Sequence, residues 1–142
     1  MITAIDTSVL LDVFLPDPQF GRQSLEVLKS CTREGALVIS EIVYAELACA
    51  FKEERIMQGV LERSGIQLHP SDRKTLWKAG ELWKQYRVRI GTSSTKQQRI
   101  LADFWIGAHA LLQADRLLTR DRGFYRDYFN VFYPFMKDEN CR

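Results

Sequence analysis

The chain has 142 residues and a formal net charge of +2, with 46% hydrophobic and 27% charged residues. These values are typical of a soluble globular domain, so we expect a single domain over residues 1–142. No run of about 18 apolar residues occurs and the N-terminus lacks a basic segment, so we expect neither a transmembrane helix nor a signal peptide. The three cysteines form no close pair, which argues against a disulfide framework and a cysteine zinc site and favours a cytoplasmic protein.

Short apolar runs alternate with longer segments of helical spacing along the chain. The segments predicted as strands are residues 2–5, 36–40, 66–69, 116–119 and 130–133, of which the third could also be an extended connection. The segments predicted as helices are residues 8–14, 20–34, 41–51, 55–64, 72–86 and 98–114, followed by a short helical turn around Phe124. Strands separated by helices imply βαβ units with right-handed crossovers. The expected fold class is α/β, a three-layer α/β/α domain with a mostly parallel sheet of four or five strands.

Local signals predict where several helices begin and end. Ser40 and Ser71 are the predicted N-caps of the helices that follow them, and Gly35 is predicted to end the second helix. The stripe predicted to face the core in the helix over residues 98–114 contains Leu101, Trp105, Ala108 and Leu112.

Two acids follow predicted strands directly. Asp6 ends the first strand, and Asp121 comes just after the strand over residues 116–119. Ligands of parallel α/β sheets bind in the crevice at the carboxyl ends of the strands, so both acids are expected at that rim. A carboxylate between two apolar runs is costly to desolvate unless it has a partner.

Two further acids lie on or beside apolar faces of predicted helices. Glu46 has apolar neighbours one helical turn away on both sides, and Asp103 shares its face with Ile100, Gly107 and Ala110. One such acid is more often a cap or half of a buried ion pair. Four acids that converge on one crevice would repel one another, and a divalent cation would remove that repulsion. Because the ligands are all oxygen, Mg²⁺ or Mn²⁺ is expected rather than zinc.

Hydroxyl side chains accompany these acids. Thr119 lies two residues before Asp121, and Thr7 and Ser8 begin the first helix. Their hydroxyl groups could orient a carboxylate or a metal-bound water. For one of Thr7 and Ser8, a role as N-cap is an equally good interpretation.

The segments "AIDTSVLL", "SEIVYAELA", "LADFWIGAHAL" and "LLTRDRGFYRDYF" resemble the successive motifs of the PIN-domain ribonucleases, and most closely those of the VapC-type toxins of prokaryotic toxin–antitoxin pairs. The resemblance extends from residue 2 to about residue 134. Segment 51–96 matches least, and it varies freely in the family. The family's acidic positions fall on Asp6, Glu46, Asp103 and Asp121, and its hydroxyl position falls on Thr119.

The resemblance implies a metal-dependent endoribonuclease that leaves a 5′-phosphate and a 3′-hydroxyl. On this basis Asp6, Asp103 and Asp121 are the expected ligands of Mg²⁺ or Mn²⁺, and Glu46 is a ligand or positions the attacking water. The resemblance also implies a homodimer and a cognate antitoxin protein that covers the acidic site. The RNA substrate would be drawn to a basic rim formed by Lys96, Arg99, Arg120, Arg122 and Arg126, for which a solvated surface is the alternative.

Other chemistry-bearing residues have plainer interpretations. His109 is expected to be packed and hydrogen-bonded, and Phe124 and Tyr125 are expected to pack against the sheet rather than stack on a base. Trp77 lies off the apolar stripe of its predicted helix and is the better candidate for a surface that binds a partner.

Several alternative functions remain at this stage. A phosphatase of the haloacid dehalogenase type needs a second Asp two residues after the first, where this chain has Ser8. A phosphoacceptor domain would need a Lys near the end of a later strand, where this chain has Arg120. A PIN nuclease of RNA processing without an antitoxin stays open, as does a non-catalytic module that binds RNA or a partner.

Overall fold

A computed structural model describes residues 1–15, 17–91, 99–121, 123–125 and 129. Its strands are β1 (Ile2–Ile5), β2 (Ala36–Ile39), β3 (Ile66–Leu68) and β4 (Arg116–Leu118). Its helices are α1 (Thr7–Phe14), α2 (Gly21–Glu34), α3 (Glu41–Ala48), α4 (Glu54–Arg63), α5 (Arg73–Ile90) and α6 (Leu101–Gln113), and a short helical turn covers residues 123–125. The predicted strand over residues 130–133 lies outside the described residues.

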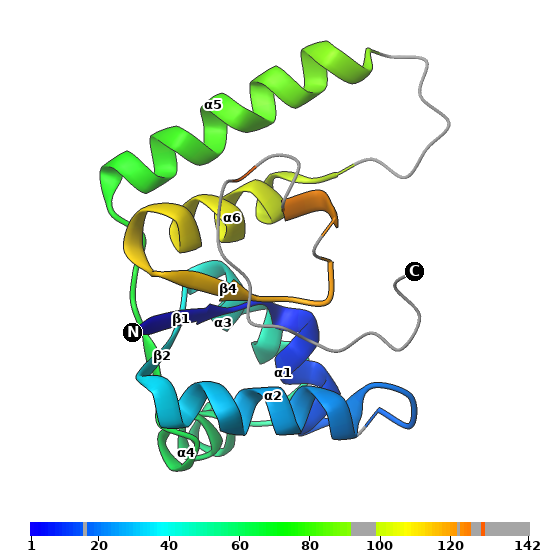
Figure 1. Cartoon of the computed structure of the whole chain (residues 1–142), viewed down its shortest axis with the longest axis vertical. Coiled ribbons are helices and arrows are strands. Elements are labelled where there is room, and N and C mark those ends of the chain that lie inside the picture. The colour runs from blue at the N-terminus through cyan, green and yellow to red at the C-terminus, as the bar shows by residue number, and fades with distance from the viewer. Residues whose placement is uncertain (16, 92–98, 122, 126–128, 130–142) are drawn as a thin grey trace.

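The four strands form one parallel sheet in the order β3-β2-β1-β4. The chain moves outward from β1 to β2 and β3, then returns past β1 to form β4. Because parallel crossovers are right-handed, this reversal places α2 and α4 on one side of the sheet and α5 and α6 on the other (Figure 1). The three-layer α/β/α prediction is confirmed. None of the described helices is long and apolar enough to cross a membrane.

The strands β1, β2 and β4 are largely buried, which explains why they are mainly apolar, whereas two of the three residues of the edge strand β3 are exposed. In β2 and β4 the central side chains, such as Val38 and Leu117, are fully buried, and Ile5 of β1 is buried as well. On the α6 side Phe104 packs against the ring of Tyr86 from α5, at a centroid distance of 5.3 Å. This pair joins the outer helix α5 to the helix that covers the sheet.

The predicted beginning of α6 is wrong, and its predicted apolar stripe is only partly buried, since Ala108 is fully buried and Leu112 is exposed. The helix begins at Leu101 rather than residue 98, because Ile100 is extended and its N–H donates to the Asp103 carboxylate at 3.0 Å. Leu112, predicted to face the core, is 48% exposed. The buried face of α6 contains Phe104 and residues 106–110, since this helix packs against both the sheet and α5.

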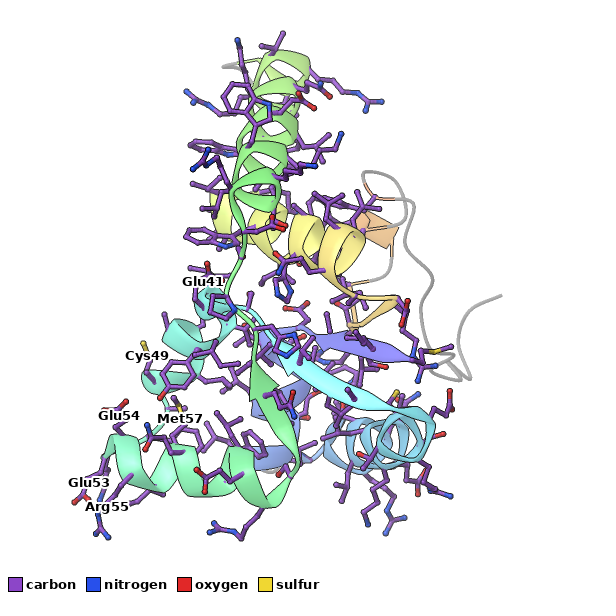
Figure 2. The ribbon with its side chains drawn as sticks, turned by 90° about the vertical axis from the view of Figure 1, so that its left-hand side faces the viewer. Glu41, Cys49, Glu53, Glu54, Arg55 and Met57 are labelled. Atoms are coloured by element: carbon purple, nitrogen blue, oxygen red, sulfur yellow. The ribbon has the colours of Figure 1, made fainter. Side chains whose placement is uncertain are left out.

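One of the two predicted serine N-caps is confirmed. Ser40 occupies the N-cap position of α3, although its hydroxyl makes no hydrogen bond within the described residues. Asp72, not Ser71, is the N-cap of α5, and its carboxylate accepts a hydrogen bond from Thr75 N at 2.8 Å. Ser71 instead donates to the Glu41 carboxylate at the start of α3 through its backbone N–H and its hydroxyl. Figure 2 labels Glu41.

His109 is packed and hydrogen-bonded as predicted. Its side chain is buried, and Nε2 lies 2.8 Å from the carbonyl oxygen of His69. Burial lowers the pKa of His109, so the imidazole is neutral at pH 7.

We predict that Asp72→Ala lowers the free energy of unfolding by about 1 kcal/mol, because it removes the acceptor for Thr75 N at the start of α5. Urea denaturation measures the change. Asp72→Asn is the matched control and should stay near wild type, since asparagine caps as well as aspartate. Equal losses in the two variants would mean that the charge, not the cap, matters.

Candidate active site

The predicted acids gather where the strand order reverses, between β1 and β4. Ile5 is paired in register with Leu118, and Asp6 N donates to Leu118 O at 2.9 Å. Asp6 therefore lies beside Thr119, each one residue beyond its strand. In open α/β sheets this switch point is where the crevice opens and ligands bind.

One buried hydroxyl joins the two strand ends. Thr119 Oγ1 donates to Asp6 Oδ2 at 2.7 Å and accepts from Asp121 N at 3.0 Å. The Thr119 hydroxyl thus donates one hydrogen bond and accepts another within the site. Thr119 fixes the orientation of the Asp6 carboxylate and the start of the loop that carries Asp121.

Glu46 and Asp103 reach the same place from α3 and α6. Thr7 Oγ1 donates to Glu46 Oε1 at 2.9 Å, which ties α3 to the residue after Asp6. The alternative role of Thr7 or Ser8 as N-cap is wrong, because Asp6 occupies the N-cap position of α1. The negative charges of Glu46 and Asp103 both act on Asp6 and raise its pKa, so the three carboxylates are neighbours.

The pKa of the Asp6 carboxyl group is raised well above its ordinary value. Burial raises its pKa most, and repulsion by Glu46 and Asp103 raises it further. The hydrogen bonds from Thr119 and from the backbone N–H of Thr7 act in the opposite direction. The net result is a pKa of about 6, against an ordinary value of 3.8. The folded chain therefore holds more negative charge at this edge than its own hydrogen bonds compensate.

Among the described residues, one basic side chain, that of Arg99, forms an ion pair with an acid of the site. The Arg99 guanidinium forms an ion pair with Asp121 and lies 4.3 Å from the centre of the Phe124 ring. The backbone N–H of Arg99 donates to the Tyr86 hydroxyl at 2.9 Å, which anchors the residue to α5. Arg99 was predicted from the sequence as a contact for RNA, but its pairing with a site acid was not, since the two are 22 residues apart.

Aromatic side chains form a wall of the site. Phe124, Tyr125 and Phe129 are buried and pack on one another, so the prediction that they pack rather than stay free for a base is confirmed. Burial, together with the charges of Asp6, Asp103 and Asp121, raises the pKa of Tyr125, so the phenol stays neutral. The sequence did not predict that Tyr125 lies near three of the acids. Asp6 and Asp103 are far from Tyr125 in the chain, so no local pattern indicates this contact.

The predicted basic rim is only partly described. Lys96, Arg122 and Arg126 lie outside the described residues. Arg120 donates two hydrogen bonds to the buried carboxylate of Asp12 in α1, from Nε to Oδ2 at 2.8 Å and from Nη2 to Oδ1 at 3.0 Å. Its guanidinium also lies 4.1 Å from the centre of the Phe20 ring. Arg120 thus joins the end of β4 to α1 and α2. Its contact with RNA stays a prediction.

The acids suit a hard cation chemically, although no ready-made ligand set exists. Within the described residues no three carboxylate, imidazole or thiolate side chains are arranged to hold a metal. Asp103 bonds Ile100 N, and Asp121 pairs with Arg99. The potential donors are nevertheless all carboxylate oxygens, which Mg²⁺ and Mn²⁺ prefer. A divalent cation would also neutralise the repulsion that raises the pKa of Asp6, so the residues fit such an ion.

Comparison with known proteins places this geometry in a family. The family model for the PIN domain matches residues 3–130. The chain belongs to the PIN-domain family. Similar solved structures include VapBC2 of Rickettsia felis bound to a promoter DNA fragment (20% identity, TM-score 0.67, covering 94% of this chain and 97% of that chain). FitAcB of Neisseria gonorrhoeae is also similar (24% identity, TM-score 0.62, covering 94% and 98%).

A third similar structure is a toxin–antitoxin complex of Klebsiella pneumoniae, with 20% identity and a TM-score of 0.67 over 95% of this chain and 99% of that chain. No curated protein matches the chain in sequence. These structures agree with the PIN-domain architecture seen here. The resemblance inferred from the four acidic motifs is confirmed at the level of the family.

We predict that Asp6→Asn makes the metal-free PIN domain more stable at pH 7. The raised pKa means that the folded state binds its proton more tightly than the unfolded state, so this acid destabilises the fold progressively as the pH rises from about 4 to about 6, and the full effect is present at pH 7. The difference from an ordinary carboxyl corresponds to at most about 3 kcal/mol. Thermal unfolding in EDTA at pH 7 and pH 4 measures it, and the gain should vanish at pH 4. A variant less stable than wild type at pH 7 contradicts the proposed repulsion and indicates a structural carboxylate.

We predict that Thr119→Val destabilises the PIN domain by about 1–3 kcal/mol, because it leaves Asp121 N and Asp6 Oδ2 without their shared partner. Thr119→Ser keeps the hydroxyl and is the control. Chemical denaturation should place Thr119→Ser closer to wild type than Thr119→Val. The reverse order would show that the methyl group, not the hydroxyl, is what the site needs.

Proposed function

We propose that this PIN domain is a metal-dependent endoribonuclease that hydrolyses RNA phosphodiester bonds. The observation that supports it most is the convergence of Asp6, Glu46 and Asp103 at the carboxyl edge of the sheet, with Asp121 held beside Asp6 by Thr119. Such a concentration of negative charge is costly for the fold, and nuclease chemistry gives it a use. PIN domains are generally nucleases, which agrees with this assignment.

In the proposed mechanism Asp6, Asp103 and Asp121 would hold Mg²⁺ or Mn²⁺. When bound, such a cation would lower the pKa of a water molecule and would neutralise charge on the scissile phosphate. Thr119 keeps the Asp6 carboxylate turned toward the crevice, and Thr7 does the same for Glu46. Glu46 accepts the proton of the attacking water or positions that water. Arg99, already at the site, is placed to contact a phosphate oxygen.

We further propose that the protein is the toxin of a type II toxin–antitoxin pair, works in the cytoplasm as a homodimer and is bound by a cognate antitoxin. Support comes from the similar structures, which include a toxin–antitoxin complex and the VapBC2 and FitAcB assemblies. A small antitoxin gene directly upstream of the reading frame distinguishes this role from that of a PIN nuclease of RNA processing. Its absence would favour the processing role.

We predict that the purified protein cleaves total RNA with Mg²⁺ or Mn²⁺ and not with EDTA, and that Asp103→Asn lowers the rate by at least about 100-fold. Gel electrophoresis of the products measures cleavage. Glu62→Gln, which neutralises an exposed acid on α4, is the matched control and should retain full activity.

Product ends provide a second measurement. Phosphatase followed by kinase labelling should reveal 5′-phosphates, as the PIN resemblance implies. If wild type and Asp103→Asn behave alike in every metal, the acids have a structural role. A non-catalytic binding module then becomes the better assignment.

A further inference from the structure

The charge of the chain is concentrated on one helix outside the acidic site. α5 contains six basic residues and a single acid, Glu81, which gives it a net charge of +5. The whole chain has a net charge of +2, so the remainder carries −3, the difference between the two values. The basic residues of α5 are Arg73, Lys74, Lys78, Lys84, Arg87 and Arg89. No feature of the fold requires this concentration.

The outer face of α5 combines positive charge with an exposed aromatic ring. Arg73, Trp77 and Lys84 recur at helical spacing on one stripe, opposite the buried Thr75 and Tyr86. Trp77 is 75% exposed, which is unusual for a residue with so large an apolar surface. Neither Arg73 nor Lys84 forms an ion pair with a described residue.

Two adjoining hollows follow this face. The first, of about 440 Å³, is lined by Arg73, Lys74, Trp77, Lys78, Glu81 and Leu112. The second, of about 410 Å³, continues past Glu81 along Lys84, Val88 and Arg89. Glu81 is the one acid in either lining, and Lys78 lies 3.4 Å from its carboxylate. The hollows therefore combine several positive charges with apolar surface, which includes one large exposed ring.

We propose that this face of α5, from Arg73 to Arg89, binds single-stranded RNA, with phosphates along the basic residues and a base stacked on Trp77. Proteins that bind single strands combine a positive groove with exposed aromatic rings in this way. An apolar protein partner would leave the charges to be desolvated, and a second copy of this face would bring +5 against +5. The charge thus favours a polyanion as the occupant.

The position of α5 connects this surface with the acidic crevice, and here the inference rests on the proposed ribonuclease function. The Tyr86 ring packs on Phe104, the residue after Asp103, and the Tyr86 hydroxyl accepts from Arg99 N. α5 also extends beyond α6 in both views (Figures 1 and 2). RNA lying on the outer face of α5 would thus be one helix layer away from α6, which carries a site acid. The face would act as a substrate-holding surface rather than as part of the chemistry.

The test measures binding with cleavage switched off. Fluorescence anisotropy of a labelled oligouridine of about 12 nucleotides, within the range of single-strand site sizes, is followed in EDTA over a salt series. The double variant Lys74→Ala/Lys84→Ala should bind several-fold more weakly, and its plot of log affinity against log salt should be shallower by about 1.4, since each lost phosphate contact removes about 0.7. The charge-matched control is Lys29→Ala/Lys52→Ala, which changes exposed lysines of α2 and of the segment before α4.

Trp77 provides an independent arm. Trp77→Ala should weaken binding roughly ten-fold, whereas Trp77→Phe, which keeps a ring, should retain most of the affinity. Circular dichroism confirms that each variant is folded, which is expected because all these positions are exposed.

Three results would overturn the proposal. Equal losses in both lysine pairs would mean general electrostatic attraction. Unchanged affinity in Trp77→Ala would remove the stacking contact. A wild-type dimer in light scattering that Trp77→Ala converts to monomer, with RNA binding intact, would make the face an interface between copies. Binding is measured without metal, so it is independent of cleavage. If the protein binds RNA on α5 but does not cleave it, the proposed nuclease function is refuted and the proposed RNA-binding surface is not.

Discussion

The carboxylate of Asp6 is the constraint around which this molecule is organised. It stands at the end of β1, a central strand that cannot shift without disturbing its pairing with both β2 and β4. The parallel pairing of β4 brings Thr119 to the same edge, and α3 and α6 add Glu46 and Asp103. Hydrogen bonds from Thr119 and from Thr7 N reduce the resulting electrostatic cost but leave the pKa well above its usual range. The fold tolerates this local instability because a large buried core surrounds it.

This negative charge explains why two arginines near the site pair with different acids. Arg99 pairs with Asp121 at the open side, where its guanidinium also covers Phe124. Arg120, the next residue after Thr119, instead turns to the buried Asp12 and thereby ties the end of β4 to α1. Arg99 therefore pairs with an acid of the site, whereas Arg120 pairs with an acid of the scaffold. Removing Asp12 would leave Arg120 without its ion-pair partner, whereas removing Asp121 would leave Arg99 without its partner at the edge of the site.

The sequence allows the sheet and the strand-end acids to be predicted, because buried parallel strands are unbroken apolar runs and Asp6 and Asp121 follow two of them directly. The boundaries of α5 and α6 could not be predicted in the same way. They depend on which side chain captures a particular N–H: Asp72 takes Thr75 N, and Asp103 takes Ile100 N. Ser71 has the properties of an N-cap but is drawn away by Glu41, which lies 30 residues earlier. Partners so distant in sequence leave no periodic signal, and for the same reason the Arg99–Asp121 pair was not foreseen.

A single crossover connects the two charged regions of the molecule. The chain leaves β3, forms α5 and α6, and returns to the sheet as β4 on the far side of β1. That return creates the switch point and also stacks the basic helix on the helix of Asp103, through the contact between Tyr86 and Phe104. Positive charge is thereby kept one helix layer away from the carboxylates, where it can attract a polyanion without neutralising the crevice. This spacing would let the proposed RNA-binding surface and the proposed metal-binding carboxylates coexist in one small domain.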